Sequence, residues 1–197
     1  MIIGLTGTFA AGKGTVAEYL IGKGFQYYSL SDELRLLLRE KGISSTRDNL
    51  MKAGNTLRAK YGKGFLANLI VRRLRGSPSV QNSVVDGIRN LGEIEAMREF
   101  KDFSLVAVDA PVDIRYERAK LRGSERDPKS FSVFMVEQKR EMAGKDTEQQ
   151  IALCMKEADF KITNDADYKK LYKQIGKILE DVKGKAAAAA TAAAKKP

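Results

Sequence analysis

Short apolar runs alternate along this chain with longer amphipathic segments. Five runs have the length and composition of buried strands and lie at residues 2–6, 26–30, 83–85, 105–108 and 160–163. The third and fourth are apolar throughout, which is typical of interior strands in a parallel sheet. Helical spacing lies between the runs, at residues 13–23, 32–41, 92–100, 112–122 and 168–182. Strands that alternate with helices predict a three-layer α/β/α fold, with a central parallel sheet of about five strands.

The segment between the second and third predicted strands is mainly helical. Residues 46–75 have amphipathic spacing that is broken near Gly62 and Gly64, and Ser31 and Gly42 are suited to begin and end the helix at 32–41. We therefore expect one domain over residues 1–183, with a helical insertion at about 31–76. Residues 184–197 are mostly alanine with a few lysines and have no apolar face, which predicts a flexible tail.

Charge and cysteine content narrow the range of partners and environments. The net charge is +10, and the lysines from Lys183 onward carry four of these charges, which leaves +6 for residues 1–182. This excess suits a phosphate-rich small ligand as well as nucleic acid. A single cysteine, Cys154, and the absence of histidine exclude an intramolecular disulfide and argue against a zinc cluster. With neither a signal-peptide pattern nor a run of about 18 apolar residues, we expect a soluble, cytoplasmic protein with no membrane partner.

A glycine-rich turn directly follows the first strand and opens the first helix. Glycines at 7 and 12 let the backbone curl so that its N–H groups point at phosphate oxygens, and the helix N-terminus adds partial positive charge. Lys13 then reaches the β- and γ-phosphates of ATP. The predicted ATP-binding loop consists of Gly7, Thr8, Phe9, Ala10, Ala11, Gly12, Lys13, Gly14 and Thr15.

Gly14 departs from the strict P-loop pattern, which has Ser or Thr at this place as a magnesium ligand. Thr15 follows one residue later, and the Gly-Lys-Gly-Thr ending resembles the loop of adenylate kinases. We therefore expect Mg²⁺ to bind through Thr15 and a carboxylate, in part through water.

Further segments resemble nucleoside monophosphate kinases, in the same order along the chain. Residues 31–35, Ser-Asp-Glu-Leu-Arg, are similar to the acceptor-site segment of that family, which implies that Arg35 clamps the acceptor phosphate. Residues 86–89, Asp-Gly-Ile-Arg, are similar to its Asp-Gly-x-x-Arg motif, although the arginine comes one residue early. The resemblance implies that Asp86 orients magnesium and that Arg89 holds acceptor phosphate. A solvated helix charge for Arg35 and a helix N-cap for Asp86 are the plainer interpretations.

Arg115, Arg118 and Arg122 recur at intervals of three and four, so they share one face of a helix. This face resembles the arginine-bearing helix and lid of the same kinases, where arginines neutralise the transferring phosphoryl group and closure excludes water. The resemblance implies a lid at about 122–132 and catalytic roles for Arg118 and Arg122, with Arg118 also in contact with ATP. An ordinary solvated face is the alternative.

Both ends of the chain also resemble dephospho-coenzyme A kinases, through residues 3–7 and 158–164. In that family an acidic residue after the second strand is the base for the acceptor hydroxyl, and Asp32 fills this place. The His-Pro pair that is usual there is replaced by Asp86-Gly87 in this chain, so this family ranks second.

Two further residues have alternative interpretations. Both resemblances place Asn164 beside the adenine of ATP, and a capping role is equally compatible with the sequence. Arg58 lies in the helical insertion and by the same resemblance contacts the acceptor, whereas an exposed polar face needs no ligand.

The predicted reaction is in-line transfer of the γ-phosphoryl group from ATP, with Mg²⁺, to a small phosphorylated acceptor, a nucleoside or deoxynucleoside monophosphate. A phosphate monoester is already ionised and needs no base, whereas the hydroxyl of dephospho-coenzyme A would require Asp32. A P-loop ATPase linked to nucleic acid through the tail is the third alternative. The sequence leaves open whether the chain is a monomer or a homodimer.

Overall fold

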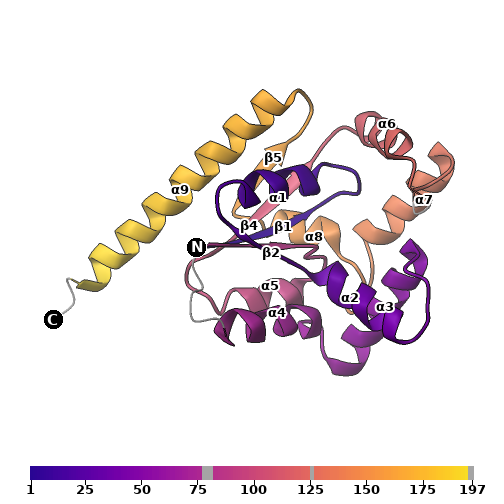
Figure 1. Cartoon of the computed structure of the whole chain (residues 1–197), viewed down its shortest axis with the longest axis horizontal. Helices are drawn as coiled ribbons and strands as arrows, with labels where there is room; N and C mark the ends of the chain where they lie inside the picture. Colours follow the sequence, from indigo (N-terminus) through magenta and orange to yellow (C-terminus); the bar gives the residue numbers. More distant parts are fainter. Residues whose placement is uncertain (77–81, 125–126, 195–197) are drawn as a thin grey trace.

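The computed structural model describes residues 1–76, 82–124 and 127–194, with side chains as far as residue 184. Strands and helices alternate along these residues (Figure 1). The strands are β1 (Ile2–Gly7), β2 (Gln26–Ser29), β3 (Ser83–Asp86), β4 (Phe103–Asp109) and β5 (Phe160–Thr163). The helices are α1 (Lys13–Ile21), α2 (Leu30–Glu40), α3 (Arg47–Tyr61), α4 (Phe65–Gly76), α5 (Leu91–Met97), α6 (Val112–Arg122), α7 (Phe131–Met142), α8 (Ile151–Lys156) and α9 (Tyr168–Ala194).

The five strands form one parallel sheet in the order β2-β3-β1-β4-β5. β1 lies in the centre, where Ile3 pairs with Val84 of β3 and Leu5 pairs with Val106 of β4. The predicted parallel sheet is therefore confirmed.

Successive side chains of each strand point to opposite faces of the sheet, and both faces are apolar. Ile2 and Val85 belong to a core with α2, α4, α5 and α8, whereas Ile3 and Val84 belong to a second core with α1 and α9. A strand buried on both faces needs apolar residues at consecutive positions, which explains the continuous runs in the sequence. The two cores confirm the three-layer α/β/α fold.

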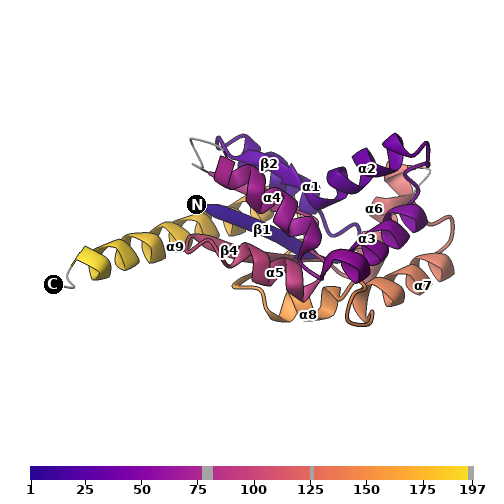
Figure 2. The ribbon, with the colours of Figure 1, turned by 90° about the horizontal axis from the view of Figure 1, so that it is seen from below.

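The carboxyl ends of the central strands meet at one edge of the sheet. β1 continues into the glycine-rich loop, β3 ends at Asp86 and β4 ends at Asp109. Helices α2, α3, α6 and α7 gather around this end of the molecule in both ribbon views (Figures 1 and 2). Open α/β sheets bind ligands at this edge.

Local details differ from the sequence prediction in two places. The helix predicted to begin after Ser31 begins at Leu30, because the Ser29 hydroxyl caps it by accepting a hydrogen bond from the Asp32 N–H (3.2 Å). Helices α7 and α8 were not predicted, and α7 begins inside the segment for which we expected a lid. The Ser130 hydroxyl caps α7 by accepting from the Val133 N–H (3.3 Å).

Helix α9 continues as far as Ala194, beyond its predicted end at Val182. Alanine has the highest helix propensity, so residues 184–194, expected as a flexible tail, have helical backbone. Figure 2 shows this end of α9 extending away from the rest of the molecule. Within the part of the chain that the structure describes, none of the helices combines the length and apolar character needed to cross a bilayer.

Candidate functional site

The glycine-rich loop has a backbone conformation that requires glycine at two positions. Gly7 and Gly12 have φ values of +134° and +99°. A Cβ atom on Gly7 would lie 1.9 Å from the Val108 carbonyl oxygen, and one on Gly12 would lie 2.2 Å from Asn164 Nδ2. Among the described residues no side chain caps the first turn of α1, so the N–H groups of that turn are left for a ligand. The conformation is that of the predicted phosphate-binding loop.

Lys13 extends back over this loop and donates to the carbonyl oxygens of Gly7 and Thr8, at 2.9 Å in each case. Desolvation lowers the pKa of its ammonium group from 10.5 to about 8, while Asp86 acts to raise that pKa and Arg89 to lower it. A desolvated ammonium group whose contacts are neutral carbonyl oxygens is well placed to exchange them for phosphate oxygens.

Two side chains, one at the end of β4 and one directly after β5, brace the loop. The Thr8 hydroxyl donates to Asp109 Oδ1 (2.5 Å), and the Asn164 side-chain amide donates to the Ala11 carbonyl (2.8 Å). Asn164 also accepts from Arg118 Nη2 at 3.4 Å, and its side chain is buried. These contacts favour a bracing role for Asn164 over the predicted contact with adenine.

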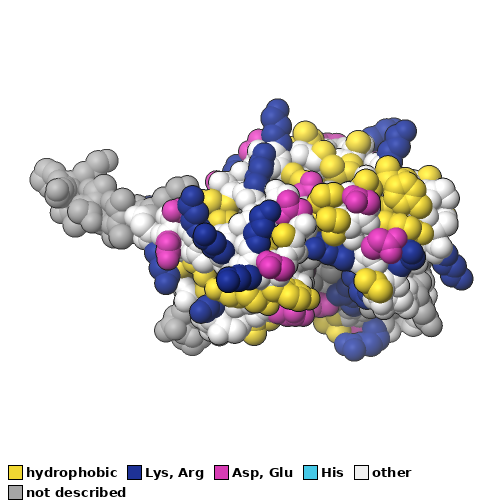
Figure 3. Space-filling model, turned by 90° about the horizontal axis from the view of Figure 1, so that it is seen from above, with side chains coloured by type: hydrophobic (Ala, Val, Ile, Leu, Met, Phe, Trp, Pro, Cys, Tyr) yellow, Lys and Arg dark blue, Asp and Glu magenta, His cyan; other side chains and the backbone are white. Residues whose placement is uncertain are grey.

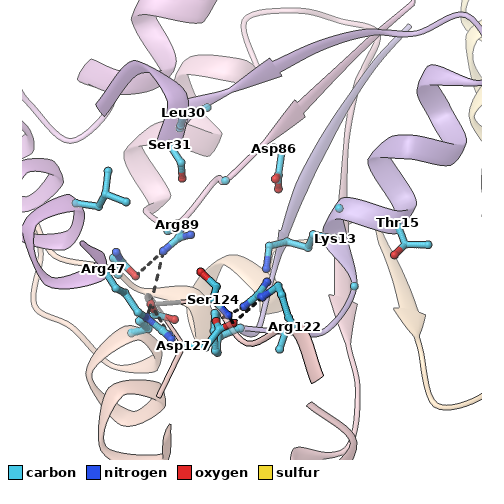
Figure 4. Close-up of a pocket in the computed structure, with 18 of the residues that line it drawn as sticks. Lys13, Thr15, Leu30, Ser31, Arg47, Asp86, Arg89, Arg122, Ser124 and Asp127 are labelled. Carbon is cyan, nitrogen blue, oxygen red and sulfur yellow. Dashed lines mark hydrogen bonds and ion pairs between the residues drawn. The ribbon is translucent and has the colours of Figure 1, made fainter. Parts of the chain in front are cut away.

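The loop forms one wall of a cavity of about 910 Å³ at the carboxyl edge of the sheet. The predicted site residues Arg35, Asp86, Arg89, Arg118 and Arg122 line it together with Lys13, as Figure 4 shows for several of them. The wall formed by α2, α3 and α4 carries apolar side chains beside Ser31, Arg35, Arg47 and Arg58. The apolar ones are Leu30, Leu34, Leu50, Met51 and Leu66.

Asp86 points into this cavity from the end of β3 (Figure 4). Its Oδ2 accepts a hydrogen bond from the Tyr27 hydroxyl at 3.4 Å, and its Oδ1 is buried with no hydrogen-bond partner among the described residues. Burial, with the charge of Asp86, raises the pKa of Tyr27 to about 12, so Tyr27 stays a hydrogen-bond donor. A buried carboxylate oxygen without a partner is unusual and indicates a missing cation or donor.

The oxygen of Asp86 and the hydroxyl of Thr15 are the kind of ligand that Mg²⁺ prefers, and both residues line the cavity. Among the described residues no group of three or more histidine, cysteine, aspartate or glutamate side chains could hold a metal ion. In Figure 4 Thr15 and Asp86 lie apart, on either side of Lys13. Mg²⁺ therefore fits here only if phosphate and water supply most of its ligands, as is usual for this ion.

Helix α6 contributes three arginines in different environments. Arg115 is buried and structural, since its Nε donates to the Ala110 carbonyl (2.8 Å), and burial lowers its pKa. Arg118 has one buried nitrogen, Nη1, with no hydrogen-bond partner among the described residues. Arg122 is held by an ion pair with Asp127, to which its Nε donates at 2.8 Å (Figure 4). The cavity thus receives Arg118 and Arg122, as predicted.

Arg89 and Arg47 converge on a single carboxylate from α7. Arg47 Nη2 lies 2.9 Å from Glu141 Oε1, and Arg89 Nη1 lies 3.6 Å from the same oxygen. Arg89 also donates to Gln149 Oε1 at 3.3 Å. Arg47, Arg89, Glu141 and Gln149 all line the cavity. An anion bound there would meet the guanidinium groups of Arg47 and Arg89, which already share the carboxylate of Glu141.

Arg58 has an environment that does not suit its predicted contact with the acceptor. Its side chain is 2% exposed, and its nitrogens donate to Thr147 O (2.8 Å), Glu93 Oε1 (3.0 Å) and Asn55 Oδ1 (2.7 Å). Burial raises the pKa of Glu93, an effect that Arg58 opposes. This buried ion pair favours a structural role, because a ligand would have to displace three protein partners.

Asp32 and Arg35 form an ion pair with each other on the exposed side of α2. Arg35 lines the main cavity and also a neighbouring hollow, which Asp32 lines with Arg39 and Ile43. Asp32 therefore borders the main cavity through Arg35 without lining it.

Comparisons with known proteins identify the family and the fold of this chain. Residues 3–148 match the family model of the AAA domain. UPF0200 protein PH1008 of Pyrococcus horikoshii is 30% identical over 186 residues, covering 92% of this chain and 97% of the relative. The chain belongs to the UPF0200 family.

Two solved structures resemble this UPF0200 member closely enough to define its fold. TT1252 from Thermus thermophilus has a TM-score of 0.60 at 20% identity, covering 92% of this chain and 97% of its own. A shikimate kinase from Bacteroides thetaiotaomicron has a TM-score of 0.53 at 14% identity, covering 93% and 98%. The chain therefore has a P-loop kinase-like fold, whereas the predicted membership of the adenylate kinase-like family is not confirmed.

Several cavity residues of this UPF0200 chain were not predicted. Asp109, which braces the loop through Thr8 without lining the cavity, was not predicted either, although it ends a buried strand just as Asp86 does. Asp127 lies in the segment predicted as a lid, although no role was predicted for its side chain. Arg47, Glu141 and Gln149 had no signal, because they lie in exposed-looking polar stretches and reach the cavity only through the packing of α3, α7 and the segment after α7.

Proposed function

We propose that this protein transfers the γ-phosphoryl group of ATP to a nucleoside or deoxynucleoside monophosphate. One observation carries the proposal: Lys13, the segment with Asp86 and Arg89, and the helix with Arg118 and Arg122 are three separate parts of the chain that line one cavity together with a group of apolar side chains. Cationic groups beside the P-loop suit two sets of phosphates, and the apolar side chains suit a nucleobase.

The mechanism follows from the placement of these groups. Lys13 and the loop N–H groups hold the β- and γ-phosphates, while Arg118 and Arg122 neutralise the charge that develops as the phosphoryl group moves. Arg89 orients the acceptor phosphate. Asp86 and Thr15 are the residues that would hold Mg²⁺, which would supply charge neutralisation on the phosphate oxygens. An ionised acceptor oxygen attacks without a base, which agrees with the position of Asp32 outside the cavity.

A hydroxyl acceptor is the second candidate, and one observation favours it. Asp86 has a carboxylate oxygen without a hydrogen-bond partner in the described structure, and that oxygen is a possible base. Asp86 would then take the role that we predicted for Asp32, with dephospho-coenzyme A as the test acceptor.

A nucleic-acid-linked ATPase receives less support. On the face seen in Figure 3, lysine and arginine side chains are interspersed with acidic ones and form no single basic patch. Nucleic-acid binding usually requires basic side chains gathered along a stripe.

The deciding experiment is a coupled ADP-release assay with ATP and Mg²⁺ against ribo- and deoxynucleoside monophosphates and dephospho-coenzyme A, with Lys13→Ala as the blank. Release stimulated by a monophosphate supports the proposal and names the acceptor. Release stimulated only by dephospho-coenzyme A favours the hydroxyl acceptor. ADP release that is independent of any acceptor would sink both and leave an ATPase.

A further inference from the structure

The side chain of Phe9 contacts two arginines of the cavity. Phe9 lies within the phosphate-binding loop, and the guanidinium carbon of Arg47 lies 3.6 Å from the centre of its ring. The guanidinium carbon of Arg122 lies 5.2 Å from the same ring. Both distances are within the range of about 6 Å over which a cation is attracted to an aromatic face. A loop residue expected only to contribute its backbone to phosphate binding therefore also holds two cationic groups.

Contacts with α6 and α7 fix the position of Phe9. Its centroid lies 5.8 Å from that of Phe134, which is 1% exposed and packs edge-on against Tyr116. The Phe9 carbonyl accepts a hydrogen bond from Arg115 Nη1 at 3.3 Å, and Arg115 is anchored to the Ala110 carbonyl. The Phe9 ring thus packs on α7, and the Phe9 backbone is bound by α6. Phe9 is therefore fixed at both its side chain and its backbone.

The two arginines come from different elements, and each has an acidic partner in the segment that follows α6. Arg47 is the first residue of α3 and pairs with Glu141 and Glu137, whereas Arg122 is the last residue of α6 and pairs with Asp127. These carboxylates hold the edges of the two guanidinium groups, since Arg122 meets both oxygens of Asp127 and Arg47 meets two glutamates. The Phe9 ring adds a contact with the flat face of each guanidinium group, and it lies on the loop that binds the phosphates.

We propose that Phe9 is a positioning residue, whose ring aligns the guanidinium groups of Arg47 and Arg122 with the phosphates held by the same loop. Through this ring the position of both arginines depends on the conformation of the P-loop. The inference rests on the proposed phosphotransferase function. It adds Arg47 to the residues that contact the transferring group, and it assigns to the Phe9 side chain a role distinct from phosphate binding by the loop backbone.

The test compares Phe9→Leu, which keeps an apolar side chain but removes the aromatic face, with Phe9→Tyr, which keeps that face. Loss of two cation–π contacts should lower kcat for phosphoryl transfer about tenfold in Phe9→Leu, while Phe9→Tyr stays within about threefold of the wild type. The Kd for ATP should change less than about twofold in both variants, because the ring does not touch the nucleotide in this proposal. In the Phe9→Leu background, Arg47→Met should cost less than it does alone, since the two residues act as a unit.

A readout without catalysis separates failure of this inference from failure of the proposed function. The Nε–H proton signals of Arg47 and Arg122 in NMR spectra should both move in Phe9→Leu, because the ring current disappears, and should stay near their places in Phe9→Tyr. Unmoved signals, an unchanged kcat in Phe9→Leu, or equal losses in Phe9→Leu and Phe9→Tyr would each overturn the positioning role. If instead the wild type phosphorylates no acceptor of the panel while the signals move as expected, the proposed function fails and the contact of Phe9 with both arginines stands.

Discussion

The positive charge of Lys13 is needed to bind the phosphates of ATP, but the buried surroundings of Lys13 lower its pKa. Because desolvation lowers its pKa to about 8, Lys13 in the free protein is protonated below that pH and loses its charge above it. Phosphates bind the protonated form and raise the pKa of the complex, so the Kd for ATP should be nearly constant below about pH 7 and should rise as the pH increases beyond about 8. Calorimetric titrations across this range measure the effect. Lys13→Met should bind weakly with no rise at that pH, and a wild-type Kd that is flat from about pH 7 to 9.5 would contradict the lowered pKa.

The two aspartates of the predicted catalytic set should differ sharply. Asp86 faces Lys13 in the cavity, whereas Asp32 lies outside it and pairs with Arg35. We expect Asp86→Asn to lower kcat about a hundredfold or more and Asp32→Asn to change it less than about threefold, measured with the best monophosphate acceptor. A severe loss in Asp32→Asn with a monophosphate would count against an acceptor that needs no base.

The position of a site residue could be predicted from the sequence where the signal was local. The P-loop glycines, Lys13 and Asp86 follow buried strands, and that position alone places them at the carboxyl edge of the sheet. Arg58 shows the limit of such reasoning. Its buried pairing with Glu93 depends on the contact between α3 and α5, which no spacing within α3 reveals.

At the scale of elements, the Arg58–Glu93 pair joins the helical insertion to α5 within the buried interior. Removing one partner leaves the other charge buried and unpaired, so Arg58→Leu should lower the free energy of unfolding by about 3–5 kcal/mol in urea denaturation. Arg58→Leu combined with Glu93→Gln should recover part of this loss, because no buried charge is left without a partner.

Arg35→Leu is the matched control for this experiment, because Arg35 is a partly exposed arginine whose ion pair with Asp32 should contribute less than about 1 kcal/mol. A loss for Arg58→Leu no larger than that of Arg35→Leu would mean that Arg58 has no structural role. The acceptor contact predicted from the sequence would then be the better explanation of Arg58.

The strands were predictable as elements, whereas α7 and α8 were not. A buried parallel strand shows itself as a continuous apolar run, and all five predicted runs are strands. In α7 only Phe134 among the apolar residues is buried, while Phe131, Val133, Met135 and Val136 are exposed, so no amphipathic stripe exists to detect. α8 is only six residues long. Both helices owe their place to tertiary packing, and α7 brings Glu141 to the cavity with it.

At the scale of the whole molecule, the layered fold was predictable because the alternation of strands and helices allows few arrangements of a parallel sheet. The composition of the cavity could not be predicted, because the acidic residues that pair with Arg47, Arg89 and Arg122 come from the segment after α6. Each of these ion pairs joins residues from different parts of the fold. Their partners therefore become visible only once the helices have been placed around the carboxyl edge of the sheet.

The C-terminal helix offers a test of which parts of the chain the proposed activity requires. α9 packs on the sheet through Leu171, Ile175, Ile178 and Val182, all of which are buried, and its described contacts with the core end there. A chain that ends at Lys183 should therefore keep kcat and KM within about twofold of the full chain, and its Tm within about 2 °C. Both quantities are measured on the same preparations.

A chain that ends at Gln174 is the matched contrast, because it removes three of the four buried anchors of α9. Each buried aliphatic side chain contributes about 1.5–3 kcal/mol, so this cut should remove about 5 kcal/mol or more, which is comparable to the whole stability of many domains. If instead the chain ending at Lys183 stays folded and loses its activity, residues 184–197 take part in function, and the nucleic-acid-linked alternative becomes the better account. If the chain that ends at Lys183 keeps its activity, the reaction requires only residues 1–183, which carry the P-loop cavity.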